Sequence, residues 1–133
     1  MGQDLLVDEQ IDAGHEFVRD FNGYASVSVA FWINPTESDD WFLYVASDEI
    51  DDGNLDVAYG EVLRKMSHNP SQWLDPFRVK LLNSSDQIAR EAIEIRDRYP
   101  APIPTRYNGS SIGGISIDGA YIYPPLSAMQ STP

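Results

Sequence analysis

Three stretches of the chain repeat apolar side chains at the three- and four-residue spacing of an α-helix. They are residues 4–21, 55–66 and 85–99. The apolar face of the first stretch includes Gly14, although glycine lowers helix propensity. We therefore expect another element to approach this helix closely at Gly14. Ser84 and Gln87 have the spacing of a capping box and predict the start of the third helix.

Five shorter stretches alternate apolar and polar side chains or are apolar throughout, as β-strands do. They are residues 25–33, 41–46, 77–82, 112–117 and 120–123. The first alternates and predicts one buried face, whereas the second is apolar on both faces and predicts a strand covered on both sides. Asp118-Gly119 separates the last two stretches, and this dipeptide between alternating runs predicts a two-residue hairpin turn.

The predicted elements follow one another in the order α-β-β-α-β-α-β-β. Hairpins require antiparallel neighbours, and the two β-α-β segments allow parallel ones. We therefore expect an α+β fold with a mixed, largely antiparallel sheet of about five strands, packed by three helices and closed by a C-terminal β-hairpin. The length of 133 residues predicts a single domain over residues 1–125. The small, polar tail at 126–133 is expected to fray.

Charge is distributed unevenly along the chain, whose net charge is −12. Residues 1–61 hold fifteen acids and one base, and residues 62–133 hold six acids and eight bases. Such an acidic surface repels nucleic acid and anionic membranes, and it could attract a basic partner. There is no cysteine, no basic leader segment and no apolar run of membrane-spanning length. The sequence therefore predicts a cytoplasmic protein without disulfides or thiolate chemistry.

Several patterns that look like catalytic or metal-binding motifs fail in their context. Residues 109–113 fit the G-x-S-x-G pattern, but a proline-rich connector precedes them and a strand, not a helix, is predicted after them. The acidic loop 48–54 lacks oxygen ligands at two required positions of a calcium-binding EF-hand loop. His15 and His68 lack the spacing of a metal-binding pair. The sequence thus predicts no catalytic residue, metal ligand or cofactor.

Arginine and tyrosine side chains crowd together between residues 96 and 125. In the predicted hairpin, Tyr121 and Tyr123 share the face opposite the isoleucines, and Arg106 enters the region from the proline-rich connector. Arginine and tyrosine on one surface are typical of protein-binding hot spots and of anion sites. The same residues also fit a structural role, at a helix C-terminus or packed beneath a helix. The predicted binding residues are Arg96, Arg98, Arg106, Tyr107, Tyr121 and Tyr123.

These observations favour a small, non-catalytic interaction or accessory module. It would use the arginine and tyrosine face of the C-terminal hairpin to bind a protein partner or a second copy of itself. Two alternatives stay open. One is an enzyme or binding protein for an anionic small molecule, held by an arginine clamp. The other is an acidic mimic of nucleic acid that binds a basic partner. Nucleic acid and membranes are not expected as partners.

Overall fold

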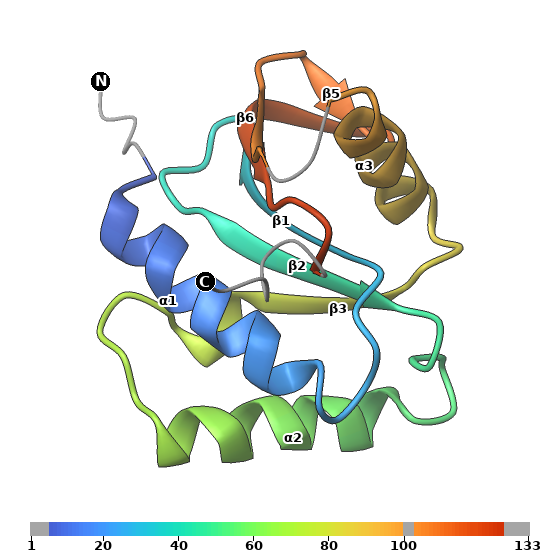
Figure 1. The fold of residues 1–133 in the computed structure, drawn as a ribbon. Helices are drawn as coiled ribbons and strands as arrows, with labels where there is room; N and C mark the ends of the chain where they lie inside the picture. The colour runs from blue at the N-terminus through green and yellow to red at the C-terminus, as the bar shows by residue number, and fades with distance from the viewer. Residues whose placement is uncertain (1–5, 100–102, 127–133) are drawn as a thin grey trace.

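The computed structural model describes residues 6–99 and 103–126, which form one mixed β-sheet with helices on both faces (Figure 1). The strands are β1 (Val29–Pro35), β2 (Phe42–Ser47), β3 (Val79–Asn83), β4 (Thr105–Tyr107), β5 (Ser111–Ile112) and β6 (Ile115–Ile122). Their order in the sheet is β3-β2-β1-β6-β4, and β5 pairs with β6. The predicted α+β class and the order of elements are confirmed, with one further short strand, β4. Of the predicted tail, only Leu126 is among the described residues, and it packs against the core.

The helices cover the two faces of the sheet unequally. They are α1 (Asp8–Phe21), α2 (Leu55–His68) and α3 (Gln87–Asp97). Side chains of α1 and α2 share one buried cluster with one face of the sheet, and α3 packs on the other face (Figure 1). No helix within the described ranges is both long and apolar enough to cross a membrane.

The central strand β1 is buried on both of its faces. Trp32 lies in the cluster beneath α1 and α2, and Phe31 and Ile33 lie in the cluster beneath α3. The face that the sequence predicts to be buried is buried, and the opposite face of the strand is buried as well. β1 pairs antiparallel with β2, as the predicted hairpin requires. β2 and β3 run parallel because α2 connects them as a crossover.

The closing hairpin turns earlier than the sequence predicts. β6 continues through Asp118 and Gly119, and its register against β1 shifts there at a bulge. The two-residue turn is instead Gly113-Gly114, with φ angles of +59° and +84°, and Ile112 pairs with Ile115 across it. The predicted Asp-Gly turn is therefore wrong, although the chain does close with a hairpin.

Two elements start later than the sequence predicts. Asp86, not Ser84, caps α3, because its carboxylate accepts a hydrogen bond from the Ile88 amide at 3.1 Å. The Ser84 hydroxyl instead donates to Ser28 at 2.6 Å. The strand predicted from residue 77 begins at Val79, after a short 3₁₀-helix, η1 (Pro76–Arg78).

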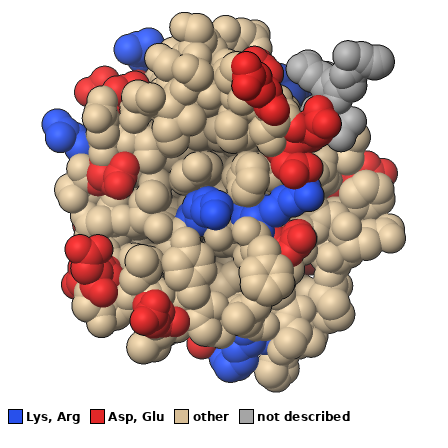
Figure 2. Space-filling view, turned by 180° about the vertical axis from the view of Figure 1, so that it is seen from behind, with Lys and Arg blue, Asp and Glu red and all other residues tan. Residues whose placement is uncertain are grey.

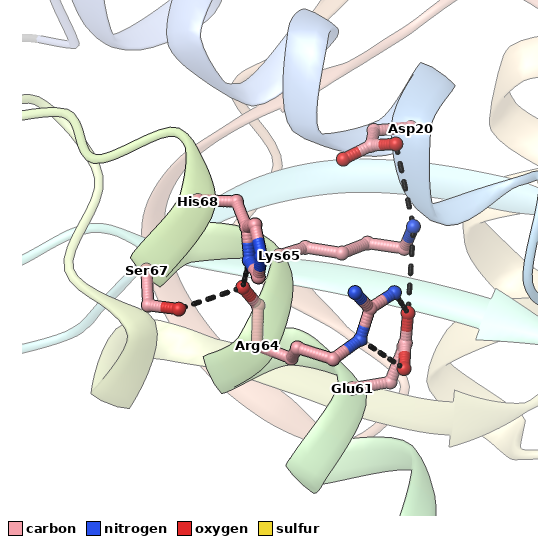
Figure 3. A network of polar contacts seen from close by, with 6 residues as sticks. All are labelled: Asp20, Glu61, Arg64, Lys65, Ser67 and His68. Carbon is pink, nitrogen blue, oxygen red and sulfur yellow. Dashed lines mark hydrogen bonds and ion pairs between the residues drawn. The ribbon is translucent and has the colours of Figure 1, made fainter.

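An ion-pair network joins α1 to α2 (Figure 3). The Lys65 ammonium lies 3.4 Å from Glu61, one turn away on α2, and 3.3 Å from Asp20 of α1. Arg64 also donates to Glu61, and this hydrogen bond holds the pKa of the Glu61 carboxyl below its usual value. Glu61 and Lys65 have the four-residue spacing that favours an ion pair on a helix, and Asp20 extends this pair across the contact between the helices.

One backbone donor at the outer edge of the sheet, on β3, is occupied by a side chain of α2. The backbone amide of Leu81 donates to the Tyr59 hydroxyl at 2.9 Å. Because β3 is an edge strand, this hydroxyl occupies a donor that would otherwise be open to another strand.

Gly14 lies where α1 comes closest to the sheet, as expected from its place on the apolar face. A Cβ atom at this position would be 2.4 Å from the Tyr123 hydroxyl and 3.1 Å from the Trp32 indole. The Tyr123 hydroxyl accepts from Trp32 Nε1 at 2.9 Å and donates to the Ile11 carbonyl at 2.6 Å. The absence of a side chain at Gly14 therefore lets one phenol link β6, β1 and α1.

We expect alkaline pH to destabilise the protein through its buried tyrosines. Burial raises the pKa of Tyr123 well above its ordinary value and also raises the pKa values of Tyr44 and Tyr121. Above about pH 10 the unfolded chain loses phenol protons that the folded chain keeps. The unfolded state then binds fewer protons, so the free energy of unfolding falls as pH rises, by up to about 1.4 kcal/mol per pH unit for Tyr123 and by less for Tyr44 and Tyr121, whose phenols are less deeply buried.

Urea denaturation between about pH 8 and about pH 11 measures this slope. Tyr123→Phe should flatten the slope above about pH 10. Tyr99→Phe is the matched control, because Tyr99 is exposed. Equal slopes for wild type and Tyr123→Phe would contradict the assignment to Tyr123.

Candidate functional site

The arginine and tyrosine residues of the predicted site lie in different parts of the molecule. Arg106 of β4 and Tyr121 of β6 are cross-strand neighbours, and the guanidinium carbon lies 5.1 Å from the centre of the Tyr121 ring. Tyr121 contacts Tyr123 edge-to-face, with ring centres 5.3 Å apart. Both tyrosines are buried in the cluster beneath α1 and α2, and of these three side chains only Arg106 is exposed.

The other three predicted residues lie elsewhere. Arg98 and Tyr107 line a shallow groove beside α3, where the Tyr107 hydroxyl donates to the Ser111 carbonyl at 3.2 Å. Arg96 donates to the Ser28 carbonyl at 2.8 Å and pairs with Asp97 at 3.1 Å. The structure therefore brings Arg106 to the tyrosines of β6, and it separates Arg96, Arg98 and Tyr107 from them.

A cleft at one end of the sheet is lined by all three tryptophans of the chain. Its volume is about 730 Å³. Its walls come from the first turn of α1, the loop between β1 and β2, and the connection between α2 and β3. The lining residues are Val7, Gln10, Trp32, Asp39, Asp40, Trp41, Gln72, Trp73, Leu74, Asp75 and Arg78. Trp32 is almost wholly buried, Trp41 is half-buried and Trp73 is 42% exposed, so the tryptophans extend from the core to the surface.

The loop between β1 and β2 is shaped by a buried asparagine. The Asn34 amide donates to the carbonyls of Ser38 and Asp40 at 2.9 and 2.8 Å, which closes the loop upon itself. Trp41 then lies across β6, where a Cβ at Gly119 would be 3.3 Å from its ring. A glycine in β6 and an asparagine in β1 therefore position the loop that carries Asp39, Asp40 and Trp41.

The opposite wall is held by local caps and by one ion pair. The Trp73 amide donates to the Ser71 hydroxyl at 3.1 Å, and Asp75 caps η1 by accepting from the Phe77 amide at 2.9 Å. Arg78 then reaches Asp40 at 3.1 Å. This ion pair joins the two walls, so the width of the cleft is set by side chains of both loops.

The cleft combines indole rings with an excess of negative charge. Its lining holds three carboxylates and one guanidinium, a net charge of 1 − 3 = −2. The electron-rich faces of tryptophan attract cations, and nearby carboxylates add to that attraction. Within the described ranges, no group of three or more histidine and acidic side chains is arranged to hold a metal ion. The chemistry of the cleft therefore suits an organic cation better than an anion.

Acidic and basic side chains are mixed on the face of the molecule turned away in Figure 1. Basic side chains lie in a hollow near the middle of this face, and acidic side chains are spread around them (Figure 2). A mimic of nucleic acid requires an array of acids alone, and this face does not present one.

The sequence interpretation did not identify the cleft. Its tryptophans are separated by 9 and 32 positions, so no spacing rule connects them. A weaker signal was present, because two segments that precede or begin predicted strands place a tryptophan beside acids. These segments are Asp39-Asp40-Trp41 and Trp73-Leu74-Asp75. Exposed aromatic residues in polar loops are an indication of binding, but only the fold brings the two loops together.

In comparisons with known proteins, no family model, no curated protein and no solved structure matches the chain.

Proposed function

We propose that the protein is a small, non-catalytic binding module that holds an organic cation in the tryptophan-lined cleft. The observation that carries the proposal is the meeting of Trp41 and Trp73 with Asp39 and Asp75 in a single cavity. Aromatic faces beside carboxylates form the usual recognition site for quaternary and methylated ammonium groups. The net charge of −12 on the chain adds a long-range field that attracts such ligands.

The size and construction of the cleft support a ligand rather than a solvent-filled gap. Its volume of about 730 Å³ lies within the range of small-molecule pockets. Trp32 is fixed by its hydrogen bond to Tyr123, and Asp40 is held by Arg78. These contacts organise the floor and one wall before a ligand arrives, which lowers the entropic cost of binding.

The arginine and tyrosine face stays a second proposal for contact with a protein partner. It is supported by Arg106, which is exposed and lies over the Tyr121 ring. It ranks second because the Tyr123 hydroxyl already donates a hydrogen bond to the Ile11 carbonyl, and the rings of Tyr121 and Tyr123 are both buried. A partner at this face would therefore contact Arg106 more than the tyrosines.

Choline is a suitable probe for the cleft, with its uncharged carbon analogue dimethylbutanol as the comparison. Because every tryptophan lines the cleft, choline should change the tryptophan fluorescence of the protein, and dimethylbutanol should do so at least about tenfold more weakly. Trp73→Ala should lower the affinity for choline about tenfold, as measured by isothermal titration calorimetry.

Phe77→Ala is the matched control, because Phe77 is 76% exposed and lies outside the cleft lining. It should leave the affinity for choline unchanged, and both variants should keep the urea midpoint of the wild type. Equal affinities for choline and dimethylbutanol would reject cation recognition. Binding of neutral sugars with no response to choline would also reject it and would assign the tryptophans to sugar stacking.

A further inference from the structure

We propose that the natural ligand of the cleft is an extended basic peptide with two cationic side chains four positions apart. This inference rests on the proposed function and adds a second subsite, which lies between α1 and α2. One cationic side chain would occupy the tryptophan-lined cleft, and the other would lie against acids of α1. An apolar side chain between them would cover the floor that connects the two subsites.

A second hollow lies beside the cleft, along the contact between α1 and α2. Trp73 and Leu74 line both cavities, and together the two, which we call the groove, follow α1 from its first turn to its last. The second hollow has a volume of about 280 Å³. Its floor is apolar and includes Ala13, Phe17 and Met66. A side chain without charge therefore fits the middle of the groove.

Three acids line the second hollow, and two of them form no ion pair within the described part of the chain. Asp12, Glu16 and Asp20 line it from α1, and Lys65 lines it from α2. Lys65 is already paired with Asp20 and Glu61 (Figure 3). Neither Asp12 nor Glu16 forms an ion pair within residues 6–99 and 103–126. These two exposed carboxylates are thus open to a cation of the ligand.

The length of the groove sets the spacing of the two cations. Gln10 lines the cleft, and the unpaired Glu16 lines the second hollow. Glu16 follows Gln10 by about 9 Å along the axis of α1, at about 1.5 Å per residue. An extended peptide advances about 3.3 Å per residue, so two steps span about 7 Å, which is too short, and four steps span about 13 Å, which covers this distance. Side chains at the first, third and fifth positions of such a peptide also point to the same side.

The test uses a capped peptide, Lys-Ala-Leu-Ala-Lys, whose symmetry makes the direction of binding irrelevant. A second peptide replaces one terminal lysine by glutamine. By calorimetry we expect the first peptide to bind at least about tenfold more tightly than the second. Glu16→Gln should weaken binding of the first peptide about threefold and leave choline binding unchanged. Glu94→Gln, on α3 at the other face, is the matched control and should change neither affinity.

The outcomes separate this inference from the proposed function. If choline binds but the two peptides bind equally, the second subsite is rejected and the cation site stands. If Glu16→Gln weakens the binding of choline as much as the binding of the two-lysine peptide, the second subsite is also rejected. If neither choline nor either peptide binds, the proposed function is rejected together with this inference.

Discussion

Replacing Gly14 by alanine is expected to lower the free energy of unfolding by about 2 to 3 kcal/mol, although alanine is the better helix former. The new methyl group would lie 2.4 Å from the Tyr123 hydroxyl and 3.1 Å from the Trp32 ring, so one of the packed elements must move. Movement of the phenol breaks its hydrogen bonds to Trp32 and Ile11 in a buried place, where unpaired polar groups are costly.

Gly60→Ala is the matched control for this substitution. Gly60 lies in the interior of α2, and a Cβ there has nothing within 4 Å. It should therefore stabilise the protein by about 0.5 to 1 kcal/mol. Tyr123→Phe removes the oxygen that the alanine methyl meets. The free energy of unfolding lost by the double variant Gly14→Ala/Tyr123→Phe should therefore be about 1 kcal/mol smaller than the sum of the losses of the two single variants. Additive losses in urea denaturation would show that the hydroxyl is not the obstacle.

Replacing Gly113 by alanine should destabilise the protein by more than about 3 kcal/mol, the largest effect of the substitutions considered. Its φ of +59° is unfavourable for a residue with a Cβ atom, and that atom would lie 2.3 Å from the backbone of Ile88. A backbone neighbour cannot rotate away as a side chain can. The hairpin would have to leave α3 and lose the hydrogen bond from the Gly113 amide to Glu91 at 2.9 Å.

Gly114→Ala separates the two causes of this loss. Gly114 also has a positive φ, of +84°, but a Cβ there has nothing within 4 Å. It should cost about 1 kcal/mol through backbone strain alone. Thermal unfolding of both variants measures the difference. Similar losses for the two would mean that contact with α3 does not fix the hairpin.

The regular elements were predictable from sequence because their signals are local. Apolar spacing located all three helices, and the crossover through α2 correctly allowed the parallel pairing of β2 with β3. The hairpin turn was misplaced because Asp118-Gly119 and Gly113-Gly114 are both suitable two-residue turns. The choice between them depends on the packing of Gly113 against Ile88, which lies in a different element.

The site was less predictable because its parts come together only in three dimensions. Alternation correctly placed Tyr121 and Tyr123 on the face opposite Ile117 and Ile122, but it could not show that α1 covers them. The cleft depends on two loops that are joined by the Arg78–Asp40 pair. No property of either loop alone indicates that they meet.

The Tyr59 hydroxyl at the edge of β3 has a consequence for association between copies of the chain. A neighbouring molecule that added a strand there would have to displace a hydrogen bond of 2.9 Å from the Leu81 amide before gaining its own. Growth of the sheet into a fibre is therefore opposed at this edge by a single phenol on α2.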